Sequence, residues 1–238
     1  MLSRGNPEEQ RTERLHIDRW KKLSQSDTSQ IRFTTSKLRL SLPWRRKMQL
    51  VPSINYFFGR RGFEHGNPAM SRRERWLLRR YLLKCRFLLE FGCGGSTLSA
   101  IRFGVPRIIS VESDPKWVKR LQKDPIISVA VASGCLSFRT IDIGPVGNWG
   151  IPVDNSRRDY YPSYFDGVWS TFNCLPDLIL IDGRFRVECA QAAISRVGPS
   201  TILLIHDYVS RPEYHVVERY LEPIDRANDL VAFRKRPR

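Results

Sequence analysis

This 238-residue chain lacks paired cysteines, a long apolar run and an N-terminal signal sequence. The chain has five cysteines, none in a C-x-x-C pair and none with histidines at zinc-binding spacing. This pattern argues against a disulfide framework or a zinc finger, and we expect reduced, mostly buried thiols. No apolar stretch approaches the length of a membrane span, and the first residues lack the apolar core of a secretory signal. The sequence therefore predicts a soluble, cytoplasmic protein.

Acidic residues are also scarce, and the shortage is concentrated in the N-terminal third. The chain has 40 Lys and Arg against 24 Asp and Glu, a formal charge of +16. Residues 1–86 hold 21 basic and 7 acidic side chains, which leaves 19 and 17 for the other 152 residues. A basic arm of this kind can bind nucleic acid or an anionic membrane by releasing counterions. Residues 1–66 show little periodicity, however, and we favour a solvated, partly disordered extension before a folded domain at 67–238.

A glycine-rich turn follows the first apolar run of that domain. Residues 87–97 read FLLEFGCGGST. The apolar run suits a strand that is buried on both faces of a parallel sheet, and glycine permits positive φ and close approach of a ligand. Ser96 or Thr97 can then cap a helix. A strand, a glycine turn and a helix N-terminus form the ligand crevice of a doubly wound α/β sheet.

A second strand and helix follow at the spacing that this crevice requires. Residues 107–112 (RIISVE) end in Glu112, 20 positions after Gly92, where a carboxylate can accept hydrogen bonds from a ribose diol. A dinucleotide-binding turn would carry a third small residue at position 97, and this chain has Thr97. An NAD-binding oxidoreductase is therefore disfavoured.

The run Glu90-x-Gly92-x-Gly94-Gly95 resembles motif I of the class I S-adenosylmethionine (SAM) methyltransferases. The resemblance covers residues 71–233 and is closest to methyltransferase-like proteins with the segments ExGxGGST, DIGxxGxWG, IDGRxR, IHDY and RPxY, all present here. It implies a three-layer, doubly wound, mostly parallel α/β sheet with SAM as the cofactor. The cofactor-binding residues that it implies are Glu90, Gly92, Gly94, Gly95, Ser96, Thr97, Glu112 at the ribose and Asp142 at the adenine.

Polar residues follow two later strands, at 177–182 and 201–206. The carboxyl ends of parallel strands meet at one edge of a sheet, so Asp182, His206, Asp207 and Tyr208 are expected to converge there. His206 or Asp207 could act as a general base on a hydroxyl. Asp182 and Asp207 could instead bind a divalent cation such as magnesium, as the resemblance to catechol-type O-methyltransferases implies, although Tyr208 stands where that family has Asn. A purely structural role for the three residues is the third alternative.

The substrate is less well defined than the cofactor. Arg184, Arg186 and Arg211 near the predicted crevice suggest an anionic acceptor, because the guanidinium fork matches carboxylates and phosphates. Tyr208 and Trp149 are further candidates for substrate contact, the latter in a lid that would include Tyr160 and Tyr161.

Periodicity gives the remaining elements. Ser71 and Glu74 form a capping box before a helix whose apolar stripe includes Trp76. Residues 126–131 and 137–143 are β-rich runs, the latter the third core strand, and helices are expected at 164–172, 187–197 and 215–221. Residues 229–235 supply one last strand where the family has a hairpin of two. The sheet would then be one strand short, which suggests a homodimer through its edge.

Together these observations predict a SAM-dependent methyltransferase that methylates oxygen of a small polar or anionic molecule. A nucleic-acid (RNA) methyltransferase is the alternative that the basic third suggests, but residues 181–184 (IDGR) replace the N-P-P-Y type of tetrad. A catalytically silent fold that binds RNA or a protein is a further alternative.

Overall fold

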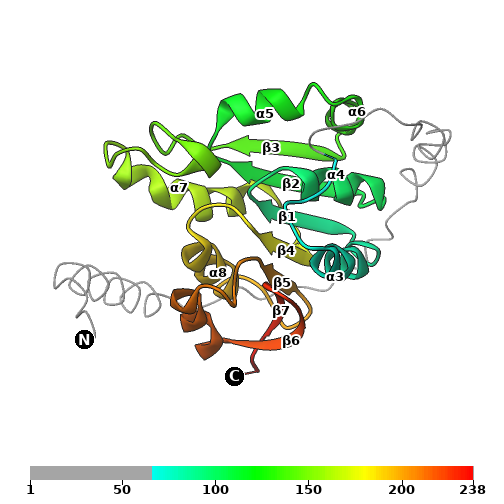
Figure 1. Ribbon diagram of the computed structural model, residues 1–238, viewed down its shortest axis with the longest axis vertical. Coiled ribbons are helices and arrows are strands. Elements are labelled where there is room, and N and C mark those ends of the chain that lie inside the picture. Colours follow the sequence, from blue (N-terminus) through cyan, green and yellow to red (C-terminus); the bar gives the residue numbers. More distant parts are fainter. Residues whose placement is uncertain (1–65, 238) are drawn as a thin grey trace, which may run out of the picture. The chain divides into compact units, whose positions relative to one another are not determined.

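The computed structural model describes residues 66–237, which contain a seven-stranded sheet covered by helices (Figure 1). The strand order is β3-β2-β1-β4-β5-β7-β6. The first five strands are parallel, whereas β7 runs antiparallel to both β5 and β6. The strands are β1 (Phe87–Phe91), β2 (Arg107–Glu112), β3 (Leu136–Thr140), β4 (Leu178–Ile181), β5 (Ile202–Ile205), β6 (Leu221–Ala227) and β7 (Leu230–Lys235). The predicted doubly wound, mostly parallel α/β fold is confirmed.

Alternate strand residues face two separate cores, so both faces of the sheet are covered. Leu88 belongs to a core that also contains side chains of α3 (Arg72–Leu82), α4 (Gly95–Arg102), α5 (Pro115–Leu121) and α6 (Pro125–Ala132). Leu89 belongs to the core on the other face, which contains side chains of α7 (Tyr161–Phe165), α8 (Arg186–Ile194) and the 3-10 helices η4 (Gly167–Thr171) and η5 (Pro212–Arg219). Burial on both faces explains the continuous apolar runs in the sequence. No helix in residues 66–237 is long and apolar enough to cross a membrane.

The start of α3 was predicted correctly from the sequence, whereas α6 was not predicted. The capping box before α3 is confirmed, since Ser71 N donates to Glu74 Oε2 at 2.5 Å and Glu74 N donates to Ser71 Oγ at 3.3 Å. Trp76, however, is 58% exposed and lies outside the apolar stripe. The expected β-rich run at 126–131 is wrong, because it forms α6, with Pro125 in the first turn and Asp124 accepting from Ile126 N at 2.8 Å. An N-cap with proline in the first turn overrides β-propensity here.

Three predictions for residues 164–235 need correction. Residues 164–172 form α7 and η4 in place of one helix, and residues 215–221 lie mostly in the 3-10 helix η5. Residues 221–227, which follow η5, form β6 and complete the hairpin with β7. The sheet is therefore not one strand short, and the reason for expecting a homodimer through its edge is removed.

Candidate active site

The glycine turn after β1 lies against the protein's own backbone at two of its three glycines. Gly92 has φ +89°, and a Cβ there would lie 2.6 Å from Gly183 Cα in the turn after β4. A Cβ on Gly95 would collide with the backbone of Asn67. Beside Gly94, by contrast, the nearest atom to such a Cβ belongs to the Trp117 ring, 3.9 Å away. Gly94 is therefore the position where the turn leaves room for a ligand.

Glu90 lies beneath this turn and has no exposed surface. Its Oε2 accepts hydrogen bonds from Thr97 Oγ1 at 2.6 Å and from Ser110 Oγ at 2.7 Å. Thr97 Oγ1 in turn accepts from Gly94 N at 2.9 Å, so the residue that replaces a third glycine braces the turn. Burial raises the pKa of Glu90 to about 7, against the lowering by neighbouring hydroxyls that include Ser96. Ser96, at the start of α4, is also buried.

Glu112, at the end of β2, reaches the same turn. Its Oε2 accepts from Cys93 N at 3.2 Å, and its Oε1 accepts from Ser113 N at 2.7 Å. The 3-10 helix η2 (Asn148–Gly150) lies beside this carboxylate, because a Cβ on Gly150 would be 3.7 Å from Glu112 Oε1. Trp149 in η2 is 79% exposed and has φ +61°. The end of β2, the glycine turn and η2 thus lie together at the carboxyl ends of the parallel strands, where a doubly wound sheet has its ligand crevice.

Asp142 lies outside the strand in which it was placed, because β3 ends at Thr140. The Asp142 carboxylate accepts from Gly144 N at 2.9 Å and pairs with Arg157 at 3.4 Å. Its contact with adenine stays a prediction.

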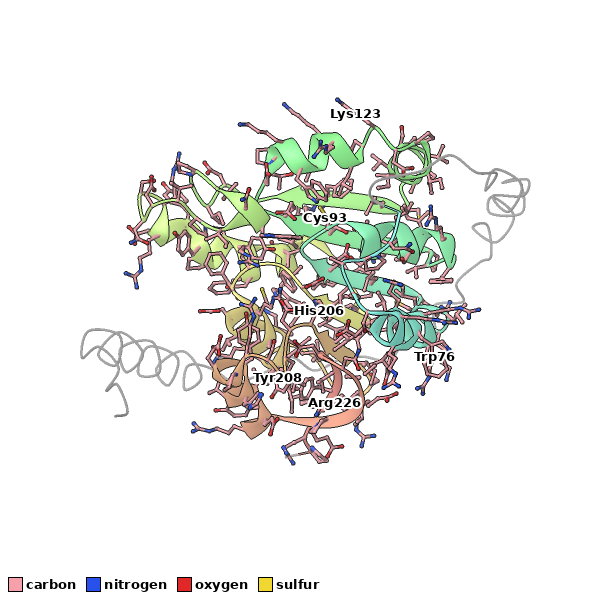
Figure 2. All side chains as sticks on the ribbon, viewed as in Figure 1. Trp76, Cys93, Lys123, His206, Tyr208 and Arg226 are labelled. Carbon is pink, nitrogen blue, oxygen red and sulfur yellow. The ribbon has the colours of Figure 1, made fainter. Side chains whose placement is uncertain are left out.

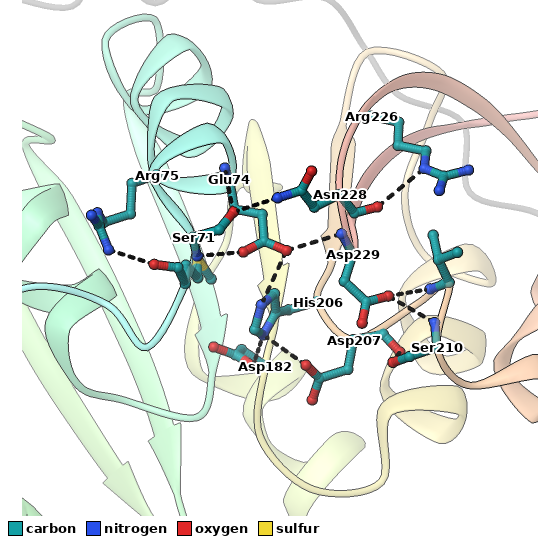
Figure 3. Close-up of polar contacts among 12 residues, drawn as sticks. Ser71, Glu74, Arg75, Asp182, His206, Asp207, Ser210, Arg226, Asn228 and Asp229 are labelled. Carbon is teal, nitrogen blue, oxygen red and sulfur yellow. Dashed lines mark hydrogen bonds and ion pairs between the residues drawn. The ribbon is translucent and has the colours of Figure 1, made fainter.

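Three of the four polar residues that were predicted to meet after β4 and β5 do converge (Figure 3). Asp182, His206 and Asp207 each offer a ligand atom, and these atoms lie within 4.8 Å of one another. His206 Nδ1 is 2.9 Å from Asp182 Oδ1 and 3.4 Å from Asp207 Oδ1. Asp207 has φ +54°, a costly conformation for a residue with a Cβ. Such strain at a strand end that faces a crevice is typical of functional positions.

His206 has a third acidic neighbour that the sequence did not suggest. Its Nε2 lies 3.8 Å from Oε1 of Glu74, the capping-box residue of α3 (Figure 3). Burial lowers the pKa of His206, but the hydrogen bond to Asp182 and the charges of Asp182, Asp207 and Glu74 raise it above its usual value overall. The surroundings therefore favour the imidazolium form, which cannot accept a proton. Only the capping-box motif of Glu74 was visible in the sequence.

Arg186 also has a different place from the one predicted. Its side chain is buried, and its guanidinium lies between Asp182 Oδ1 at 3.2 Å and Asp207 Oδ2 at 3.0 Å. It also donates to three main-chain oxygens, those of Gly183 at 3.1 Å, Asp182 at 3.2 Å and His206. These contacts hold it inside the site, so it is not free to bind a substrate.

This arrangement bears on the predicted magnesium site. A cation bound to both Asp182 and Asp207 would compete with a guanidinium that already pairs with both carboxylates and is fixed by main-chain acceptors. Displacing a buried arginine would leave its own charge unpaired, which is costly. The residues present therefore do not fit a divalent cation at this position.

The remaining candidates for substrate contact separate into two groups. Arg184 is half-buried, its Nε has no hydrogen-bond partner within residues 66–237, and its pKa is lowered by burial and by the nearby charge of Arg186. Arg211 contacts Asp207 Oδ2 at 3.4 Å from the rim of the site. Tyr208, by contrast, packs on Phe233, and its hydroxyl donates to Oε1 of the exposed Glu218 at 2.9 Å, away from the cluster of Asp182, His206 and Asp207 (Figure 2 labels Tyr208).

Solved structures of other proteins resemble this chain. The chain is similar to a solved methyltransferase-like protein of Silicibacter pomeroyi, at 34% identity and a TM-score of 0.65, over 73% of this chain and 90% of that one. The SAM-bound O-methyltransferase TomG of Streptomyces achromogenes has 14% identity and a TM-score of 0.44, over 69% and 79% of the two chains. A methyltransferase of Geobacter sulfurreducens has 10% identity and a TM-score of 0.45, over 70% and 80%. No protein-family model and no curated protein matches.

The chain belongs to the methyltransferase-like proteins of the class I SAM-dependent methyltransferase superfamily, as the relative at 34% identity shows. SAM is the cofactor that the sequence motifs imply for a member of this family. The residues of the crevice fit this cofactor: the turn is open at Gly94, and the Glu112 carboxylate lies within hydrogen-bonding distance of that turn.

Proposed function

We propose that this enzyme methylates a hydroxyl oxygen of a small anionic molecule, in the crevice between the glycine turn and the ends of β4 and β5. The observation that carries the proposal is the cluster of Asp182, His206 and Asp207 beside that turn. Gly92 and Gly183 are in backbone contact, so the cofactor turn and the polar cluster belong to one site.

The cofactor is held on the β1–β2 side of the crevice. We assign Gly94 and the neighbouring turn to its amino-acid part and Glu112 to its ribose diol, which a carboxylate at this strand end suits. Bound there, SAM supplies an electrophilic methyl group on its sulfonium sulfur. Glu90 and Thr97 act as positioning residues, because their hydrogen bonds fix the turn from below.

Asp207 is the residue that we assign to the acceptor hydroxyl. Its side chain is 28% exposed, against 10% for His206 and 22% for Asp182, so it is the most accessible of the three. A hydroxyl that attacks a methyl group must lose its proton, and Asp207 can accept that proton as the oxygen–carbon bond forms. His206 and Arg186 hold the Asp207 carboxylate in place, at 3.4 Å and 3.0 Å.

Arg184 supports the proposal that the acceptor is anionic. Within residues 66–237 no carboxylate pairs with this half-buried guanidinium. Arg211 adds a second positive charge at the rim. A carboxylate or phosphate on the substrate would pair with Arg184 and offset the repulsion from its neighbours, since guanidinium binds both groups in a fork.

A paired measurement tests the proposal. SAM affinity is measured by calorimetry, and release of S-adenosylhomocysteine is measured with a panel of phenols, hydroxy acids and phosphorylated sugars. Asp207→Asn should lower turnover at least about a hundredfold, the usual worth of a general base, while SAM affinity stays within about threefold. Asp166→Asn, at a surface ion pair with Arg196, is the matched control and should leave both unchanged.

Two outcomes would reject the proposal. One is an Asp207→Asn enzyme that keeps full turnover on the acceptor. The other is equal loss of turnover and SAM affinity in His206→Ala and Asp207→Ala, which would assign these residues a structural role. Arg184→Gln should raise KM for anionic acceptors and leave KM for neutral ones unchanged.

A further inference from the structure

A groove of about 820 Å³ lies along α3, outside the active-site crevice. Helix α3, part of α4 and the β6–β7 turn form its walls, and Figure 2 shows Trp76 and Arg226 on the elements that border it. The side chains that give the groove its character are five arginines and a tryptophan: Arg72, Arg73, Arg75, Arg79, Arg226 and Trp76.

The groove is positively charged without local compensation. No acidic residue lines it. Arg72, Arg73, Arg79 and Arg226 are exposed, and within residues 66–237 none of the four is ion-paired with a carboxylate. Like charges held together on a folded surface repel one another, and a polyanion that bound there would relieve this repulsion and release counterions.

Aromatic surface accompanies the charge. Trp76 is 58% exposed, and the guanidinium of Arg80 lies 4.9 Å from its ring centroid. On the α4 side, Arg79 lies 5.7 Å from the ring centroid of Phe103. Exposed aromatic rings beside arginines form the stacking platforms on which proteins hold unpaired bases. Paired bases in a duplex do not offer their faces in this way.

The groove is separate from the cofactor site. Asn67 and Pro68 line the groove, and their backbone also packs on Gly95 of the cofactor turn. This segment is therefore a wall between the two, and a ligand in the groove would not occupy the place of the cofactor.

We propose that this groove binds single-stranded nucleic acid, with the arginines on its phosphates and Trp76 stacked on a base. The proposal does not depend on the identity of the methyl acceptor. From helical periodicity alone, the basic face of α3 would be interpreted as solvated surface, whereas here it has a ligand.

The test is fluorescence anisotropy of a labelled 12-nucleotide RNA with the full chain. The double variant Arg72→Glu/Arg79→Glu should bind at least tenfold more weakly, and its slope of log affinity against log salt should fall by about 1.4, or 0.7 for each lost phosphate contact. Trp76→Ala should bind at least about fivefold more weakly. Arg120→Glu, on the exposed face of α5, is the matched control and should bind as the wild type does.

SAM affinity should be the same in all of these variants, which separates a local effect from misfolding. If the double variant unfolds, Arg72→Gln/Arg79→Gln removes the same phosphate contacts without adding acid. Equal RNA affinity of the groove variants and the Arg120→Glu control would overturn the proposal. So would duplex RNA that binds more tightly than single strands, or an unchanged affinity of Trp76→Ala together with full competition by heparin, a polyanion without bases.

Discussion

Replacement of Arg186 by methionine tests how the acidic cluster is held together. The wild-type guanidinium lies 3.2 Å from Asp182 and 3.0 Å from Asp207 and donates to three main-chain oxygens. Methionine fills most of the volume but leaves two carboxylates close together without their cation. Removing one partner of a buried ion pair costs about 3–5 kcal/mol. The side chains of Asp182 and Asp207 are 22% and 28% exposed, so we expect a loss of stability at the lower end of this range, about 3 kcal/mol.

Urea unfolding followed by circular dichroism measures this loss. Arg196→Met is the matched control, because Arg196 forms a 2.5 Å ion pair with Asp166 whose side chains are 33% and 47% exposed. An ion pair at that exposure is worth about 0–1 kcal/mol. The difference between the two variants therefore reports burial of the Arg186 charge and not the loss of an arginine in general.

Magnesium provides a second measurement on the same variant. Without the guanidinium, Asp182, His206 and Asp207 are left as a set of ligands, so magnesium should stabilise Arg186→Met by binding only its folded state. The wild type should show no such stabilisation, and a chelator should not slow its methyl transfer. Wild-type activity that a chelator removes and magnesium restores would refute the exclusion of magnesium. An Arg186→Met variant that unfolds at the same urea concentration as the wild type would refute the role of Arg186 in holding the two aspartates.

Three further predictions concern the cofactor crevice. The raised pKa of Glu90, about 7 against 4.5, means that the folded state keeps a proton which the unfolded state loses. Stability should fall by roughly 3 kcal/mol as pH rises from about 4.5 to about 7, and Glu90→Gln should flatten this dependence in urea melts across that range. Gly92→Ala should lower the free energy of unfolding by at least about 2 kcal/mol, because the new Cβ would lie 2.6 Å from Gly183 Cα. The control Gly104→Ala also has a positive φ of +76° but no atom within 4 Å of its Cβ, and should lower the free energy of unfolding by about 1 kcal/mol in the same urea melts. Glu112→Gln should weaken SAM binding at least tenfold by calorimetry, and unchanged affinity would remove its assignment to the ribose.

The order and type of many elements could be predicted because they depend on neighbours in the sequence. The run of apolar residues before Glu90 required a strand buried on both faces, and the Ser71–Glu74 pair predicted a helix start that the structure confirms. Helix α6 was not predicted, because its β-branched residues favour a strand, whereas the N-cap Asp124 and Pro125 that start the helix lie just before them. Strand β6, which contains Pro223, could not be recognised alone, since its partner β7 supplies its hydrogen bonds.

Some residues of the active site could likewise be predicted from the sequence, and others could not. The sequence by itself determined that Asp182, His206 and Asp207 would meet, since parallel neighbouring strands bring their carboxyl ends to one edge. Only the tertiary structure placed Glu74 beside His206 and inserted Arg186 between the two aspartates. The physical reason is that such contacts depend on how separate elements pack, which no local pattern encodes. Glu74 in α3 accepts a hydrogen bond from the backbone N–H of Asp229, which lies 155 positions later in the chain. This contact between distant segments places the Glu74 carboxylate beside His206 as its third acidic neighbour.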